Sequence, residues 1–320
     1  MNALQKHLRR TKAGFICIKR DILSYTILFG MIMPLLCYGA CAESSDYDWI
    51  QDKLNSLIDT FTSNDETDFT SNDIIVPVSS VKSSDIILDV GSDPEKYIYG
   101  AVHIPFTALM ENNSLKPLPA IAAILGDAGI SRNDSVALYG KCLPCGGGPS
   151  TATFVYWIMR YAGHENVKLI DGGYEEWVRA GGQTQNMPSL RNKTAFVLNP
   201  RSDLLANYSY VARGEAQLVD ARPPRDFVLG TIPGSINIPY DEVIEGDKIK
   251  NESSLQSVFS KINNKKPVVV YTTTGVKASV VWFALTLMGY DAKLYTFQDW
   301  YYHKGLMYLP ERQDVIETEI

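Results

Sequence analysis

A degenerate internal repeat most strongly constrains how this chain can fold. An apolar segment reaching Asp89 is matched by one reaching Asp220, 131 residues later, and a segment ending at Tyr139 is matched by one ending at Tyr271, 132 residues later. Between these segments, a Gly-x-x-x-Ile-Pro turn at residues 100–105 is repeated at 234–239. Spacings that agree within one residue indicate two copies of one folding unit.

Each copy alternates continuous apolar segments of strand length with segments of helical character. Continuous apolar strands separated by helices are typical of a mostly parallel sheet that helices cover on both faces. We therefore predict the α/β class, with two tandem domains at residues 75–182 and 201–313. A proline-containing segment at 183–200, with little periodicity, is the predicted linker.

The N-terminus has the composition of an export signal. Residues 1–42 carry a net charge of +5 and end in an apolar run from 22 to 42, whereas the rest of the chain carries −11. A basic start, an apolar core and small residues before a polar stretch form a signal peptide, or a membrane anchor if uncleaved. We expect residues 43–74 to be a polar tether with a short helix. The expected location is extracytoplasmic, with the protein secreted or tethered to the membrane by its N-terminal segment.

The segment after Tyr139 carries the predicted chemistry. It reads Gly-Lys-Cys-Leu-Pro-Cys-Gly-Gly-Gly-Pro-Ser over residues 140–150, and a helical stretch follows from Thr151. Parallel sheets place reacting groups beyond the carboxyl ends of their strands, and glycines followed by a helix N-terminus favour a bound anion. A cysteine in this setting has a lowered pKa and acts as a nucleophile, so Cys142 and Cys145 are the predicted catalytic residues.

Both copies resemble rhodanese domains, and the tandem is similar to two-domain thiosulfate and 3-mercaptopyruvate sulfurtransferases. The resemblance is carried by the two aspartate-ended strands, the repeated turns, the cysteine loop, and Asp171-Gly172-Gly173 with Trp177. It implies that a Cys-x-x-Gly-x-Ser/Thr loop, which residues 145–150 fit, cradles a persulfide. The substrate-binding residues that we predict are Lys141, Gly146, Gly147, Gly148, Ser150 and Thr151.

The chain also departs from that family's pattern. Gly140 stands directly after the strand, where the family usually has its cysteine, and Cys145 comes five residues later. In the second copy Thr272 occupies that position, and a hydroxyl cannot replace a thiolate as a sulfur carrier. We therefore expect the second domain to be inactive and to close the cleft. It keeps Arg222 two residues after its aspartate, whereas the first domain has Gly91.

These observations predict an exported sulfurtransferase that moves a sulfane sulfur from a donor such as thiosulfate through a Cys145 persulfide. The acceptor would be a thiol, cyanide or Cys142, which forms a C-x-x-C motif with Cys145. If Cys142 is not an acceptor, it is a structural disulfide partner or a bystander thiol. Two alternatives stay open: a thiol–disulfide oxidoreductase or redox sensor using that pair, and a non-catalytic binding module. We expect no cofactor, no metal, because the histidines are scattered, and no nucleic-acid partner, because the chain is acidic.

Overall fold

The computed structural model describes residues 74–142 and 147–305. These residues all belong to one compact unit, Phe69–Ile320. The predicted signal segment and nearly all of the tether lie outside the described residues, as do Cys145 and Gly146. In the described part of the chain, no helix is both long and apolar enough to cross a membrane.

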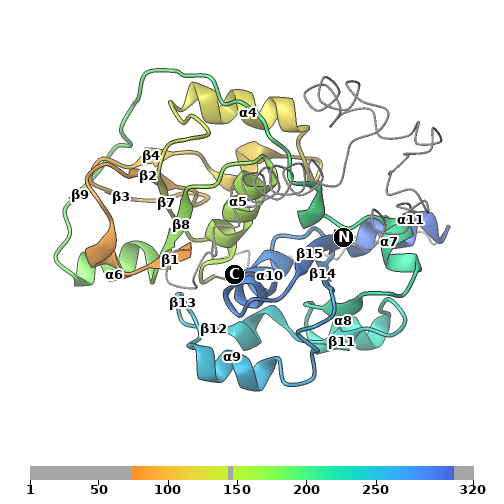
Figure 1. The fold of residues 1–320 in the computed structure, drawn as a ribbon. Coiled ribbons are helices and arrows are strands. Elements are labelled where there is room, and N and C mark those ends of the chain that lie inside the picture. Colours follow the sequence, from red (N-terminus) through yellow and green to blue (C-terminus); the bar gives the residue numbers. More distant parts are fainter. Residues whose placement is uncertain (1–73, 143–146, 306–320) are drawn as a thin grey trace, which may run out of the picture. The chain divides into compact units, whose positions relative to one another are not determined.

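The first domain is built on a parallel five-stranded sheet (Figure 1). In sheet order its strands are β1 (Ile75–Val76), β8 (Val167–Ile170), β7 (Val136–Tyr139), β2 (Ile86–Asp89) and β4 (Val102–His103). Its helices are α4 (Leu118–Asp127), α5 (Ser150–Tyr161), α6 (Gly173–Arg179) and the 3-10 turns η2 (Val78–Ser80) and η3 (Phe106–Leu109). Two antiparallel pairs complete it, namely β3 (Tyr97–Ile98) with β9 (Thr184–Gln185) and β5 (Met110–Glu111) with β6 (Ser114–Leu115).

The second domain repeats this plan with a parallel four-stranded sheet. In sheet order its strands are β11 (Ile236–Asn237), β10 (Gln217–Asp220), β14 (Val268–Thr272) and β15 (Ala292–Thr296). Its helices are α7 (Tyr208–Ala212), α8 (Pro224–Leu229), α9 (Glu252–Val258), α10 (Ala278–Leu287), α11 (Phe297–His303) and the turns η4 (Ser202–Leu204) and η5 (Tyr240–Val243). A hairpin is formed by β12 (Ile244–Glu245) and β13 (Lys248–Ile249).

The two sheets share the same strand register. Asp89 of β2 lies opposite Tyr139 of β7, and Asp220 of β10 lies opposite Tyr271 of β14. The repeat found in the sequence therefore holds at the level of individual strand pairs.

Both faces of the first sheet are covered. Along β7, Val136 and Leu138 pack into a core cluster that includes side chains of α4 and α5. Ala137 and Tyr139 belong to a separate cluster against which residues of α6 pack. Because successive strand residues point to opposite faces, this division shows helices on both sides of the sheet. The predicted fold class is confirmed.

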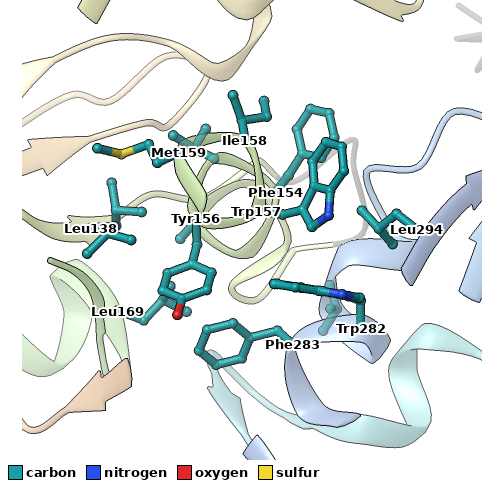
Figure 2. Close-up of a cluster of buried hydrophobic side chains, with 14 of the residues drawn as sticks. Leu138, Phe154, Tyr156, Trp157, Ile158, Met159, Leu169, Trp282, Phe283 and Leu294 are labelled. Atoms are coloured by element: carbon teal, nitrogen blue, oxygen red, sulfur yellow. The ribbon is translucent and has the colours of Figure 1, made fainter. Parts of the chain in front are cut away.

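Helices α5 and α10 form the core shared by the two domains. Residues 150–159 of α5 and 278–285 of α10 are all buried, as expected for helices that are covered on every side. Figure 2 shows Tyr156 directed toward Phe283, and the two rings meet edge-to-face with their centroids 5.0 Å apart. Within this apolar contact, the Thr153 and Ser279 hydroxyl oxygens lie 2.9 Å apart. The second domain thus covers the helix that follows the cysteine loop.

Candidate active site

A cavity of about 510 Å³ lies at the carboxyl ends of β2, β7 and β8 in the first domain. This is the sheet edge where parallel α/β folds bind their ligands. Cys142, Gly148 and Pro149 line it, and these residues stand on either side of Cys145 in the sequence. The predicted cysteine loop therefore borders the cavity through the residues that flank it.

The two ends of the loop are held together. The Gly147 N–H donates a hydrogen bond to the Cys142 carbonyl at 3.0 Å. Gly147 and Gly148 have φ values of 68° and 56°, a left-handed conformation that glycine adopts without steric cost. A Cβ at Gly148 would also lie 3.2 Å from the Gly246 carbonyl of the second domain. The glycines predicted to shape an anion site are thus required by the backbone path of the loop.

The other predicted loop residues lie at the start of α5. The Ser150 hydroxyl donates to the Gly147 carbonyl at 3.0 Å, which fixes the end of the loop to the helix. Thr151 is wholly buried, and its hydroxyl has no hydrogen-bond partner among the described residues. Because the positive end of a 12-residue helix faces the loop, negative charge is favoured there.

Cys142 is 5% exposed and is disulfide-bonded. Every other cysteine of the chain lies outside the described residues. The roles assigned to Cys145 and Gly146 therefore stay predictions.

Gly140 cannot be replaced by a larger residue without a backbone shift. A Cβ at this position would lie 2.6 Å from the Gly91 nitrogen and 2.8 Å from the Val90 carbonyl carbon. This close approach of two chain segments leaves no room for a cysteine side chain directly after the strand. In the second domain the corresponding Thr272 is accommodated, and its hydroxyl accepts a hydrogen bond from the Gly275 N–H at 3.1 Å.

Lys141 lines the cavity with its ammonium group already paired. Its Nζ lies 3.1 Å from the Glu175 carboxylate and 3.0 Å from that of Asp247. Burial lowers the pKa of Lys141, but the hydrogen bonds to Asp247 and Glu175 outweigh burial and raise it. The lysine is therefore charged and neutralised by two carboxylates.

Asp247 comes from the turn between β12 and β13 of the second domain. Beside it, the Lys248 ammonium lies 3.4 Å from Asp171 and 3.2 Å from Glu176. The second domain thus contributes Asp247 to the cavity wall, and its hairpin forms three ion pairs with the first domain. Sequence analysis missed Asp247, because no motif marks a turn that reaches the site from another domain.

These features define a class of protein, and comparison with known proteins agrees with it. The rhodanese-like domain family matches residues 79–180 and 206–301, which together exceed half of the chain. The chain belongs to this family, and its tandem arrangement is that of a rhodanese-type sulfurtransferase.

The individual relatives share less than 30% of their residues with this chain over the matched segments. "Putative thiosulfate sulfurtransferase 1" from Mycobacterium bovis is 26% identical over 236 residues, which cover 64% of this chain and 83% of the relative. "Sulfur carrier protein TtuD" from Thermus thermophilus is 28% identical over 197 residues, covering 53% and 67%. Among solved structures, the 3-mercaptopyruvate sulfotransferase SseA from Escherichia coli superposes with a TM-score of 0.62 at 22% identity, covering 70% of this chain and 98% of SseA. This last similarity shows the fold.

Proposed function

We propose that the enzyme transfers sulfane sulfur through a persulfide on Cys145. The Cys145 thiolate attacks the outer sulfur of a donor such as thiosulfate or a polysulfide. With thiosulfate, the donor S–S bond breaks, sulfite leaves with the bonding electron pair, and Cys145 carries the sulfur. A thiol, cyanide or Cys142 then removes it.

One observation carries this proposal. Cys142 and Gly148, each three residues from Cys145, both line the cavity at the carboxyl edge of the sheet. The N-terminus of α5 follows at once and favours an anionic sulfur near the loop. We assign the backbone N–H groups of Gly146, Gly148, Ser150 and Thr151 to the persulfide; that of Gly147, also predicted, instead donates to the Cys142 carbonyl.

Mass spectrometry of the intact protein tests the assignment. The protein is reduced, incubated with thiosulfate and weighed, beside Cys145→Ser and the matched control Cys142→Ser. We expect a gain of one sulfur atom on Cys142→Ser and none on Cys145→Ser; a wild type that loses two hydrogen atoms instead has resolved its persulfide with Cys142. A sulfur adduct that persists on Cys145→Ser would overturn the assignment.

The disulfide of Cys142 supports a second candidate, a thiol–disulfide oxidoreductase. In the sulfur-transfer scheme, attack of the Cys142 thiolate on the inner sulfur of the persulfide forms a disulfide with Cys145 and expels hydrosulfide. In the second candidate the same pair reduces a disulfide substrate with no sulfur donor present. Stoichiometric reduction of insulin disulfides by the reduced protein without thiosulfate, lost in Cys142→Ser, would favour this candidate.

We place the enzyme outside the cytoplasm. The support is the basic and apolar segment at residues 1–42, followed by a polar stretch. Cell fractionation with N-terminal sequencing tests it, and a chain beginning at Glu43 in the extracytoplasmic fraction is the result expected for cleavage. An uncleaved chain in the membrane fraction indicates an anchor, and an uncleaved chain in the cytoplasmic fraction refutes export.

A further inference from the structure

In the second domain, an arginine side chain occupies the space at the carboxyl ends of the sheet strands. The Arg222 guanidinium donates to both carboxylate oxygens of Asp220, at 3.0 and 2.6 Å, and to the Gly230 carbonyl at 2.6 Å. Its central carbon also lies 3.7 Å from the centroid of the Phe297 ring. A carboxylate and an aromatic face together form a binding site for a planar cation.

The first domain repeats this receptor without the arginine. Asp89 corresponds to Asp220 by strand register, and Tyr174 corresponds to Phe297, since each stands three residues before a tryptophan. Gly91 stands where the second domain has Arg222. Asp89, Gly91 and Tyr174 all line the cavity of about 510 Å³. The space that Arg222 fills in one domain is therefore open in the other.

The carboxylate that faces this space is buried and short of positive charge. Asp89 is 1% exposed; it accepts hydrogen bonds from the Gly91 N–H at 2.7 Å and from the Tyr139 hydroxyl, and it lies 3.7 Å from His103 Nδ1. Among the described residues, no lysine or arginine forms an ion pair with it. A buried carboxylate is costly without a charged partner, so an adjacent cation is favoured.

The rest of the wall strengthens this preference. Its other charged residues are Asp93, Glu95, Lys96, Lys141, Glu175 and Asp247. Acidic side chains outnumber basic ones, and Lys141 is already neutralised by two of them. The net negative charge of this lining favours a cationic ligand.

From this geometry we propose that the cavity of the first domain binds a guanidinium or ammonium group of the sulfur acceptor. Asp89 accepts its hydrogen bonds and Tyr174 covers its face, as Asp220 and Phe297 do for Arg222. Asp89 and the acidic residues near it disfavour a dianion at their end of the cavity, so that end is assigned to the acceptor, whereas the α5 N-terminus favours the anionic donor beside the loop. The role in sulfur transfer rests on the proposed function, whereas cation binding does not.

Calorimetry with methylguanidinium tests the binding site directly. N-Methylurea, which is neutral and of the same shape, is the matched ligand. We expect methylguanidinium to bind the wild type at least tenfold more tightly than N-methylurea. Asp89→Asn keeps an oxygen for the Gly91 N–H and should lose that preference, whereas Asp127→Asn, outside the cavity, should retain it.

Gly91→Arg is a second variant that fills the cavity from within. Gly91 does not have a positive φ, so the backbone admits a side chain. A Cβ there would lie 3.1 Å from Asp89 Oδ1 and 3.2 Å from the Lys141 carbonyl, so circular dichroism must first show that the variant folds. We expect no methylguanidinium binding. Equal binding of the two ligands to the wild type, or unchanged binding to folded Asp89→Asn, would overturn the site.

A transfer assay tests the assignment to the acceptor. Persulfide-loaded protein is mixed with cysteamine, which is positively charged, or with neutral 2-mercaptoethanol, and loss of the persulfide is timed. The ratio of the two rates is compared between wild type and Asp89→Asn, so that the intrinsic reactivity of each thiol cancels. We expect this ratio to fall at least fivefold in the variant, and an unchanged ratio would refute the acceptor role. Failure to load sulfur would instead refute the proposed function and leave the calorimetric result to decide the cation site.

Discussion

The two domains place an aspartate at the same strand end and surround it differently. Asp220 accepts hydrogen bonds from the Arg222 backbone and guanidinium and from the Thr231 hydroxyl, so both of its oxygens are occupied by the protein. Asp89 accepts hydrogen bonds from the Gly91 N–H and the Tyr139 hydroxyl, and it has a histidine at a longer distance where Asp220 has a guanidinium. The domain without a cysteine thus has a closed edge, and the domain with the cysteine loop has an open one.

In this duplicated fold, one domain uses the shared strand end for stability and the other keeps it free for binding. Removing one partner of a buried carboxylate–arginine pair strongly destabilises the folded protein, because the remaining charge is left uncompensated. The first domain lacks that partner and keeps a cavity beside its loop. The second domain contributes to the site by covering α5 and by extending its hairpin, with Asp247, to the cavity wall.

The largest effect is expected for Arg222→Gly, which gives the second domain the residue found at the corresponding position of the first domain. The substitution leaves Asp220 buried without a cation, so we expect the free energy of unfolding to fall by about 3–5 kcal/mol. Urea denaturation followed by tryptophan fluorescence measures it. Arg222→Gly combined with Asp220→Asn should lose less, because the uncompensated charge is also removed.

Methylguanidinium provides a control for this variant. If the pocket of Arg222 is a cation receptor, the added cation should raise the melting temperature of Arg222→Gly more than that of the wild type. A variant as stable as the wild type, or one that N-methylurea rescues equally, would contradict this account of the second domain.

The second prediction concerns acid, to which the domains should respond differently. His164 is wholly buried and stacks on Phe196, and burial lowers its pKa to about 4 from an ordinary 6.5. The second domain has Tyr290 at the corresponding position after its glycine. Between pH 6.5 and 4 the unfolded state binds a proton that the folded state excludes, so stability falls as the pH falls, by about 3 kcal/mol in total.

His164→Phe removes this titration and isolates it from those of the carboxylates. The free energy of unfolding is measured from pH 7 to pH 4.5 for both proteins. We expect the wild type to lose stability more steeply over that range, with the difference growing as the pH falls. Parallel curves would show that His164 is not the group responsible.

The sequence predicted the features that the chain determines locally. Continuous apolar runs such as 136–139 and 268–271 became the central strands, because a strand buried on both faces has few polar positions. The repeat also located the sheet edge at which the cavity lies. The sequence shows that Gly91 stands where the second domain has an arginine. The open space beside Asp89, however, follows only from how the surrounding side chains pack, which the sequence alone does not reveal.

Other parts of the site depend on contacts distant in sequence. Asp247 reaches the first domain from a hairpin 106 residues after Lys141, and neither residue signals the other. The close approach of Gly140 to Gly91 is likewise set by how two loops cross. Such juxtapositions follow from tertiary packing, which a local pattern does not encode.

The smallest effect is expected at that hairpin, where Asp247→Asn tests how the second domain is held to the site. The Lys141 and Asp247 side chains are 36% and 31% exposed, so water and salt weaken their attraction. We expect a loss below about 1 kcal/mol at low salt, shrinking further at high salt. Asp127→Asn, which breaks a more exposed pair with Lys193, is the matched control. Because apolar packing of α5 against α10 carries the interface, a loss of several kcal/mol in Asp247→Asn would show that charge, and not burial, holds the second domain against the cavity.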